Sequence, residues 1–316
     1  MAAMVEVEKL VKHFGSITAV DGVSFAVERG EVLGFLGPNG AGKSTTMKMI
    51  SGFLTPDRGR IHIEGMDIAR HPISSKQRIG YLPEGAPLYG DMSPRLFLEF
   101  VGAIRGLRGA ELNSRVAAVV DGINLNAVID QPIDTLSKGF KRRVGVAQAI
   151  LHDPDVLILD EPTDGLDPNQ KYEVRNLIRE MARQKAIILS THILEEVDAV
   201  CTRAIIIAGG RIVADGEPAD LEARSPHHNA VILDIRNHAA ADIESALGSL
   251  AGVKEVSSEP TQEGLIRFVV FPEGGNSVID RVSNAVRENH WLVEEMHVER
   301  GHLDEVFRSV TQVQTS

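Results

Sequence analysis

The sequence contains one cysteine, Cys201, and one tryptophan in 316 residues. A single cysteine excludes a disulfide within the chain and a cysteine-rich metal site. The chain also lacks any run of 18 or more apolar residues, so no segment is expected to span a bilayer as a helix. Residues 1–10 carry acidic side chains within an apolar run and lack the layout of a secretory signal. These absences predict a cytosolic protein that is not itself inserted into a membrane.

Positive charge is also scarce. Lysine and arginine total 33 against 44 aspartates and glutamates, which leaves a net charge of −11. Because nothing offsets repulsion from a phosphate backbone, non-specific binding of nucleic acid is not expected. A few local donors can still bind a nucleotide. The length favours two domains, and a composition of 43% hydrophobic and 24% charged residues is typical of a globular protein.

The order of sequence patterns predicts an α/β fold. Residues 5–10 and 19–27 alternate as paired strands do, and the apolar run 32–36 leads through a glycine-rich loop into a helix over 44–51. A mainly helical section follows at about 92–151. Two wholly apolar runs, 156–159 and 186–189, are typical of parallel strands buried on both faces, with a helix at 170–183 between them.

The character of the chain changes after this region. Residues 223–229 include Arg224-Ser225-Pro226 and are predicted to be a linker between a domain over 1–222 and a second domain over 230–316. In the second domain, strands are expected at 231–235, 253–257, 265–271 and 292–298, with helices at 240–250 and 277–288. This β-α-β-β-α-β order predicts a small α+β domain of the ferredoxin-like type.

One motif carries specific chemistry. Its residues match the G-x-x-x-x-G-K-[ST] pattern of a P-loop: Gly37, Pro38, Asn39, Gly40, Ala41, Gly42, Lys43 and Ser44. Glycines let the backbone approach phosphates, whose charge is favoured by successive N–H groups at a helix N-terminus. Lys43 supplies a positive charge, and the Ser44 hydroxyl is placed to ligate Mg²⁺. We therefore expect these residues and the following Thr45 to bind ATP.

Two carboxylates complete the predicted site. Asp160 and Glu161 follow the apolar run 156–159, at the edge of a parallel sheet where ligands bind. Asp160 is expected to be an outer partner of Mg²⁺, and Glu161 to polarise a water molecule aimed at the γ-phosphate. Seen alone, the pair could merely cap the turn at Pro162, but a P-loop needs such an acid on a neighbouring strand.

Further residues resemble the ABC family of ATPases. Leu136-Ser137-Lys138-Gly139-Phe140 is similar to the ABC signature, usually Leu-Ser-Gly-Gly-Gln, and Asp164-Gly165-Leu166-Asp167 is similar to the D-loop. His192 stands where the family has its switch histidine, and Phe14 where a ring stacks on adenine. The resemblance covers residues 4 to about 222. It implies a P-loop NTPase fold of ABC type, with an antiparallel β subdomain and a helical subdomain.

The resemblance also implies a mechanism. ABC ATPases close as head-to-tail dimers around two ATP molecules, so Ser137 and Gly139 are expected to touch the γ-phosphate bound by the opposite chain. Asp167 of the D-loop is also expected to be a cofactor-binding residue. His192 is expected to hold the γ-phosphate and the attacking water. The expected cofactors are ATP and Mg²⁺, and the expected assembly is a homodimer formed with ATP.

Three residues depart from the family pattern. Lys138 and Phe140 replace a glycine and a glutamine of the signature, and the Lys138 side chain either assists the phosphates or faces solvent. Glu84 stands where most relatives carry the glutamine of the Q-loop. A carboxylate can approach Mg²⁺ through water, so Glu84 is a candidate metal partner; otherwise it is an exposed loop acid.

The resemblance implies a membrane partner. In the family, the segment after the Q-loop receives a short helix of a multi-spanning permease; here that segment is 86–95. Its apolar residues either form this surface or pack inside the helical subdomain; they are Pro87, Leu88, Tyr89, Met92 and Pro94. The signature variant resembles the gliding-motility and nitrous-oxide-reductase-maturation type, which carries a similar C-terminal extension. We therefore expect an exporter-type subunit, peripheral on the inner face of the cell membrane through its permease.

Two alternatives follow from the same motifs. A soluble ABC ATPase acting on ribosomes or DNA would share the P-loop. Ribosomal relatives usually hold two cassettes in one chain, and DNA-repair relatives insert a long coiled coil between P-loop and signature. Here there is one cassette, and residues 45–136 show no sustained heptads. The C-terminal domain could instead be a regulatory module, which is compatible with a transport motor.

Overall fold

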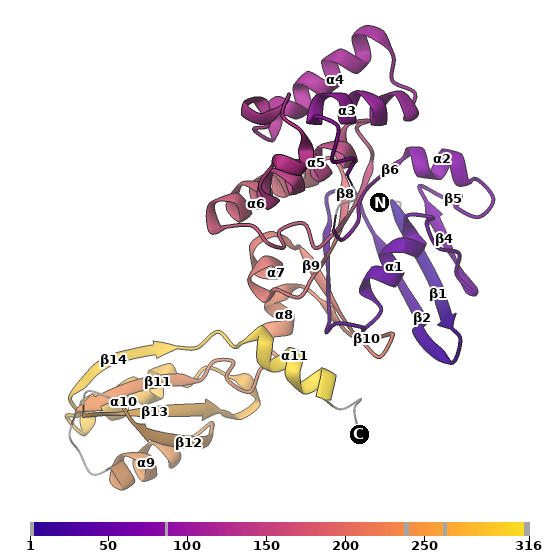
Figure 1. The fold of residues 1–316 in the computed structure, drawn as a ribbon. Helices are drawn as coiled ribbons and strands as arrows, with labels where there is room; N and C mark the ends of the chain where they lie inside the picture. Colours follow the sequence, from indigo (N-terminus) through magenta and orange to yellow (C-terminus); the bar gives the residue numbers. More distant parts are fainter. Residues whose placement is uncertain (1–2, 86–87, 237–239, 262–263, 313–316) are drawn as a thin grey trace. The chain divides into compact units, whose positions relative to one another are not determined.

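The computed structural model describes residues 3–85, 88–236, 240–261 and 264–312. The chain divides into two compact units, the first running to Gly216 and the second beginning at Glu217 (Figure 1). This division lies before the predicted boundary at 222, so residues 217–222 group with the second unit. Within the described ranges, no helix combines the length and hydropathy of a membrane-spanning segment.

The first unit contains an antiparallel sheet. Its strands are β1 (Val5–Phe14), β2 (Ile17–Val27), β4 (Arg58–Ile63) and β5 (Met66–Asp67), in the order β2-β1-β4-β5. Alternate residues of β1 such as Val5 and Val7 are buried while their neighbours are exposed, which is the pattern of a sheet with one face on a core. The tight turn after β1 uses Gly15 at a φ of 58°.

A second, mainly parallel sheet forms the centre of this unit. Its strands are β3 (Val32–Leu36), β6 (Ile79–Leu82), β7 (Val156–Asp160), β8 (Ala186–Thr191), β9 (Arg203–Ala208) and β10 (Arg211–Gly216). Their order is β10-β9-β3-β8-β7-β6, and only the β9–β10 pair is antiparallel among the pairings described. Every residue of β3, β7 and β8 is buried, because one core packs on each face.

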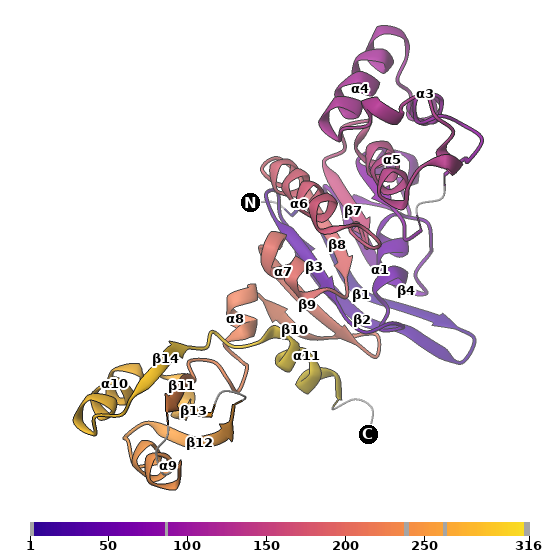
Figure 2. The same cartoon turned by 60° about the vertical axis from the view of Figure 1, so that its left-hand side comes forward.

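Helices cover both faces of this sheet (Figure 2). Met47 of α1 (Lys43–Ile50) shares one core with Phe35, and Ile178 of α6 (Pro168–Ala182) shares the other with Leu157. Two short helices complete this part, α2 (Pro72–Gln77) and α7 (Leu194–Val200).

The predicted helical section contains α3 (Pro94–Ile104), α4 (Gly109–Gly122) and α5 (Lys138–Ile150), with 3-10 turns at Asn126–Val128 and Ile133–Thr135. It has a core of its own around Leu98, Leu125 and Val144. Serine hydroxyls cap the N-termini of two of these helices. Ser93 accepts from Leu96 N at the start of α3, and Ser137 accepts from Phe140 N at the start of α5.

The second unit begins with α8 (Pro218–Glu222). It continues with β11 (Val231–Arg236), α9 (Ala240–Gly248), β12 (Val253–Pro260), β13 (Leu265–Pro272), a 3-10 turn (Glu273–Gly275), α10 (Ile279–Glu288), β14 (Val293–Val298) and α11 (Leu303–Gln312). The described strands pair antiparallel in the order β12-β13-β11-β14. Val231, Leu233 and Phe268 form a core with Leu247 of α9 and Val282 of α10.

The segment 223–229 is not a free linker. Ser225 is buried, and its hydroxyl donates to Glu305 of α11. His227 Nδ1 lies 2.7 Å from the other oxygen of the same carboxylate. A composition rich in serine, proline and histidine predicts a linker from local preference alone, whereas here a distant helix supplies the partner that orders the segment.

Candidate functional site

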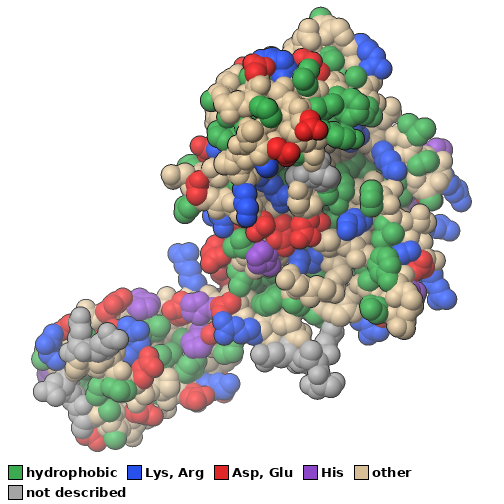
Figure 3. All heavy atoms as spheres, viewed as in Figure 1, with side chains coloured by type: hydrophobic (Ala, Val, Ile, Leu, Met, Phe, Trp, Pro, Cys, Tyr) green, Lys and Arg blue, Asp and Glu red, His purple; other side chains and the backbone are tan. Residues whose placement is uncertain are grey.

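Strand order brings distant residues to one place. The carboxyl ends of β3, β6 and β7 meet at one edge of the central sheet, where a cavity of about 300 Å³ lies. The residues that line it are Asn39, Gly40, Ala41, Gly42, Lys43, Ser44, Thr45, Glu84 and Glu161. Figure 3 shows acidic side chains gathered on this face of the first unit.

The loop requires glycine at definite positions. Gly42 has a φ of 106°, and a Cβ there would lie 2.4 Å from the Ala19 carbonyl oxygen. A Cβ on Gly37 would lie 2.5 Å from the Ile207 oxygen. Gly40 also has a positive φ, of 79°. Side chains are therefore excluded where the loop turns into α1, which leaves its backbone N–H groups accessible to an anion.

Lys43 lies within this loop. Its ammonium group donates to the carbonyl oxygens of Gly37 at 2.7 Å and Pro38 at 3.2 Å. Burial lowers the pKa of Lys43, although the carboxylates of Glu161, Asp160 and Glu84 act in the opposite direction. The loop thus holds a buried cation next to three carboxylates, an arrangement that favours an anionic ligand with an associated metal ion.

Asp160 is fully buried at the end of β7. Its Oδ1 accepts from Ser44 Oγ at 3.3 Å and from Ser190 Oγ of β8. Its Oδ2 is buried without a hydrogen-bond partner in the described part of the chain, and a buried unpaired carboxylate oxygen is costly. No three described side chains of histidine, cysteine, aspartate or glutamate group as a metal site. The Asp160 and Ser44 oxygens are hard donors of the kind Mg²⁺ prefers when phosphate and water supply its other ligands.

Glu161 and His192 lie in direct contact. His192 Nδ1 is 2.8 Å from Glu161 Oε2 and 3.0 Å from Oε1. Glu161 has a φ of 52°, and its N–H donates to the Ser190 carbonyl at 3.1 Å, so the turn after β7 aims its side chain toward the cavity. Such a carboxylate, next to both the loop and an imidazole, can accept a proton from water.

The remaining predicted residues lie elsewhere. Ser137 is exposed as the N-cap of α5, and the Asp167 carboxylate caps α6 by accepting from Gln170 N at 2.9 Å. Gly139 is buried beneath Gln170, whose Oε1 would lie 2.2 Å from a Cβ at that position. None of the three is among the described residues that line the cavity.

Phe14 also lies outside the cavity lining. It ends β1 with half of its surface exposed, and the Lys12 ammonium lies 5.7 Å from its ring centroid. An exposed ring beside a cation is available for stacking on a planar ligand. Of the two substituted signature residues, Lys138 is exposed and the Phe140 ring is half-buried under Arg143.

Sequence patterns missed Arg142. This side chain is 6% exposed, and it donates to the backbone oxygens of Asp160 at 2.7 Å and Pro162 at 3.1 Å. Burial lowers the pKa of Arg142, while the surrounding carboxylates oppose that shift. A basic residue on a predicted helix is exposed by default, so only its position two residues after Phe140, on the buried face of α5, could have indicated this role.

Sequence patterns also missed Glu196, because a charged residue on a predicted helix is expected to be exposed. It is 2% exposed on α7, and its carboxylate accepts from Thr163 and from Thr191, the latter at 2.7 Å. Burial raises the pKa of Glu196. These bonds connect the turn after Glu161 to the strand end before His192, which holds the two residues at a fixed separation.

The chain is similar in sequence and in fold to ATP-binding proteins of ABC transporters. The family model described as ABC transporter matches residues 20–164. A probable multidrug ABC transporter ATP-binding protein of Escherichia coli is 38% identical over 223 residues, which is 70% of this chain and only 38% of that relative's length. A linearmycin resistance ATP-binding protein of Bacillus subtilis is 31% identical over 309 residues, 98% of each chain. A solved ATP-binding subunit of an ABC transporter, 33% identical, has a TM-score of 0.65 over 69% of this chain and 92% of its own.

Proposed function

Because the chain belongs to the family of ABC transporter ATP-binding proteins, we propose that it is the ATP-hydrolysing subunit of an exporter. The observation that carries this proposal is that the glycine loop, Lys43 and Glu161 line the same cavity. The names of its relatives, which refer to multidrug transport and to linearmycin resistance, support export of a compound as its task.

The loop is proposed to bind the triphosphate of ATP. Its N–H groups and the Lys43 ammonium are the donors, and Phe14 offers an exposed ring for the adenine. Mg²⁺ fits the unpartnered Asp160 Oδ2 and the Ser44 hydroxyl, with Glu84 near enough to the loop to act through water. When bound, the ion neutralises charge on the phosphates.

Glu161 is proposed to act as the general base. Its carboxylate accepts the proton of a water molecule directed at the γ-phosphate, and His192 orients that carboxylate through their hydrogen bond. Glu196 positions both Glu161 and His192. It accepts hydrogen bonds from Thr163, two residues after Glu161, and from Thr191, which directly precedes His192.

Assembly is proposed to be a head-to-tail homodimer with ATP at the interface. Ser137, Gly139 and Asp167 stand at the N-termini of α5 and α6, outside the cavity of their own chain. A helix N-terminus is a ready anion site, so Ser137 and Gly139 at the start of α5 suit the phosphates bound by a second copy. The Asp167 carboxylate already caps α6, so it is assigned to the protein contacts of the proposed interface and not to phosphate.

The permease partner is proposed to dock on an exposed apolar surface beside α3. A groove of about 450 Å³ is lined in part by Phe53, Ile73 and Ile104, each more than two-thirds exposed. On α3, Leu96 and Phe100 extend this surface at helical spacing, and Figure 3 shows hydrophobic side chains over that helix. Such a surface fits a short amphipathic helix.

Part of the predicted docking segment packs inward instead. Leu88 and Met92 contact the core of the helical section, and Pro94 is buried. Tyr89 is 58% exposed and packs edge-on against Phe100. Ala86 and Pro87 lie outside the described residues. The proposed surface therefore keeps Tyr89 and takes its other members from α3 and from the segments around Phe53 and Ile73.

For the second unit we propose a ferredoxin-like accessory domain. Its β-α-β-β-α-β order and antiparallel strand order β12-β13-β11-β14 support this assignment. Membership in the gliding-motility and nitrous-oxide-reductase-maturation type, and a location on the inner face of the cell membrane through the permease, stay predictions.

The variant Glu161→Gln tests the proposed function. Without the general base, ATP and Mg²⁺ should bind with turnover reduced at least 100-fold, and the chain should elute as a dimer in size-exclusion chromatography with light scattering. Lys43→Ala, which removes the positive charge proposed to bind the phosphates, should remain a monomer under the same conditions. A Glu161→Gln chain that stays monomeric with normal turnover would contradict the assignment. Co-purification with ribosomes or DNA in place of a permease would overturn the transport role alone.

A further inference from the structure

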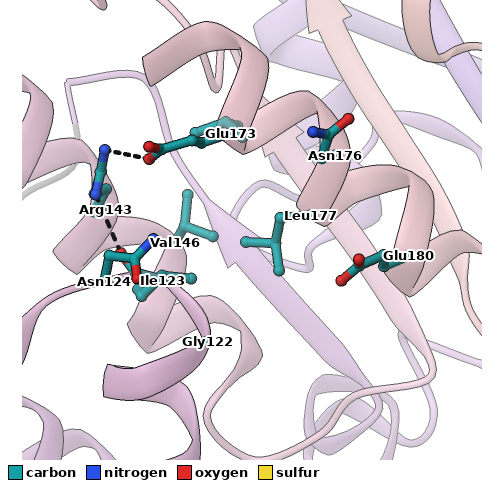
Figure 4. A pocket seen from close by; sticks show the side chains of 10 residues that line it. Gly122, Ile123, Asn124, Arg143, Val146, Glu173, Asn176, Leu177 and Glu180 are labelled. Atoms are coloured by element: carbon teal, nitrogen blue, oxygen red, sulfur yellow. Dashed lines mark hydrogen bonds and ion pairs between the residues drawn. The ribbon is translucent and has the colours of Figure 1, made fainter. Parts of the chain in front are cut away.

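Another cavity lies away from the nucleotide site. The end of α4 and the helices α5 and α6 enclose a groove of about 210 Å³ (Figure 4). Its floor is apolar: Ile123 and Val146 are buried, and Leu177 of α6 points toward Val146 across the groove. Nothing in the proposed ATPase mechanism uses these side chains, so the groove requires a separate account.

One end of the groove is closed by a satisfied ion pair. Arg143 Nη2 donates to Glu173 Oε2 at 2.5 Å, and the guanidinium lies 5.5 Å from the Phe140 ring centroid. The side chain of Arg143 is only 12% exposed. Its positive charge is therefore already matched and does not call for an anionic ligand.

The other end carries an unmatched carboxylate. Glu180 lines the groove, is exposed to solvent, and has no hydrogen bond or ion pair with the residues that the structure describes. It lies seven residues after Glu173 on α6, on the same helix face and about 10 Å further along the axis. An apolar floor that is flanked by Asn124 and Asn176 and ends at an exposed, unpaired carboxylate matches a ligand with a short apolar body and a positively charged end.

The groove also joins the two helices that carry the proposed dimer contacts. Arg143 and Val146 belong to α5, which begins after Ser137, and Leu177 and Glu180 belong to α6, which begins after Asp167. A ligand that contacts both helices stabilises the conformation in which α5 and α6 have the spacing seen here. Its effect would therefore reach the residues proposed to meet the nucleotide of a second copy.

We propose that this groove binds a small amphipathic amine and that its occupancy slows ATP turnover by restraining α5 against α6. The binding site itself depends only on the groove, whereas the effect on turnover rests on the proposed function. The volume lies below the ~300 Å³ at which pockets for drug-sized ligands begin, so the ligand is an amine of few carbon atoms.

Binding is tested on the full chain without nucleotide. Hexylamine, hexanol and hexanoate share one apolar chain and differ in the charge of their end group, and their affinities can be ranked by saturation-transfer NMR titration. We expect hexylamine to bind most tightly and hexanoate most weakly. Glu180→Gln should weaken hexylamine binding about two- to fivefold, the range for one exposed ion pair, and leave hexanol unchanged. Glu111→Gln, an exposed glutamate at the start of α4, is the matched control.

A second variant fills the groove. Gly122 lines the groove, and a Cβ built there meets no atom within 4 Å, so a side chain can start there without a clash. Gly122→Leu should weaken binding of both hexylamine and hexanol. Equal affinities for hexylamine and hexanoate, or equal effects of Glu180→Gln and Glu111→Gln, would overturn the site. Binding that leaves ATP turnover unchanged would overturn only the regulatory part, and a chain without ATPase activity would contradict the proposed function while leaving the binding result intact.

Discussion

At the level of single residues, buried polar side chains hold the ends of β7 and β8 together. Ser190 donates to Asp160, and the Glu161 N–H donates to the Ser190 carbonyl. Glu196 adds bonds to Thr163 and Thr191. Since a buried polar group without a partner costs free energy, these bonds restrict the strand ends to one arrangement, and the candidate base and its histidine are fixed by the same set.

His152 offers a pH-dependent readout of folding. Burial lowers its pKa to about 4 from the usual 6.5, and its Nε2 lies 3.1 Å from the Ile79 carbonyl oxygen. The unfolded chain therefore binds more protons between these two values, so the contribution of His152 to the free energy of unfolding rises with pH from 4 to 6.5 and is lost as pH falls.

We predict that His152→Asn reduces this rise. Urea unfolding at several pH values between 4.5 and 7 should give a shallower pH dependence for the variant than for the original chain. Other titrating groups affect both chains alike and cancel in the difference. Parallel curves for the two chains would show that His152 is not held neutral by the fold.

At the level of elements, Arg142 bonds α5 to the end of β7 and to the turns beside the candidate site. Arg142 donates to the backbone oxygens of Asp160 and Pro162, and at 3.5 Å to that of Pro83, which precedes Glu84. One guanidinium thus connects α5, which begins after Ser137, with two segments of the candidate site. Its planar group of several donors is suited to three acceptors at once.

We predict that Arg142→Met destabilises the chain by about 2–4 kcal/mol, because buried carbonyl groups lose their donors. Arg142→Lys should retain part of the stability, since one ammonium can reach fewer of the acceptors, and should lower the kcat of ATP hydrolysis more than it alters KM. Chemical denaturation and steady-state kinetics measure the two effects. Lys138→Ala, an exposed change on the same helix, serves as the stability control.

Element order was largely accessible from sequence because hydrophobic periodicity reflects burial. The alternation at 19–27 and the apolar runs at 32–36 and 156–159 became β2, β3 and β7. The ends of elements were less accessible. β12 runs on to Pro260 through mostly exposed residues, and the segment 223–229 is ordered by Glu305. Where a strand ends, and whether a segment is ordered, depends on pairing with a neighbouring strand or bonding to a distant carboxylate. Local composition does not contain this information.

At the scale of the molecule, the chain consists of two units that each have a core. The first unit packs around its two sheets and the helical section, and the second around β11, β13, α9 and α10. A unit with its own core can fold by itself. The proposed catalytic residues all belong to the first unit, so the second is not needed to complete the cavity.

We predict that a chain ending at Gly216 unfolds cooperatively and binds ATP. Thermal unfolding followed by circular dichroism, and nucleotide titration with and without residues 217–316, measure the outcome. Loss of a cooperative transition in the shortened chain would contradict the independence of the first unit. Comparison of ATPase rates also tests the regulatory hypothesis, since unchanged rate and dimerisation would exclude such a role for the second unit.

The sequence by itself determined the features that neighbouring residues create. The turn of the phosphate loop depends on Gly37, Gly40 and Gly42, and the paired Asp160 and Glu161 end an apolar strand, so short-range sterics and burial specify both. Only the tertiary structure decided which groups meet. The Ser190 bond to Asp160 follows from β8 lying beside β7, and the role of Arg142 follows from the face that α5 turns toward the end of β7. The groove ending at Glu180 follows from the faces that α5 and α6 turn toward each other. Such contacts depend on strand order and helix packing between distant segments, which no local pattern encodes.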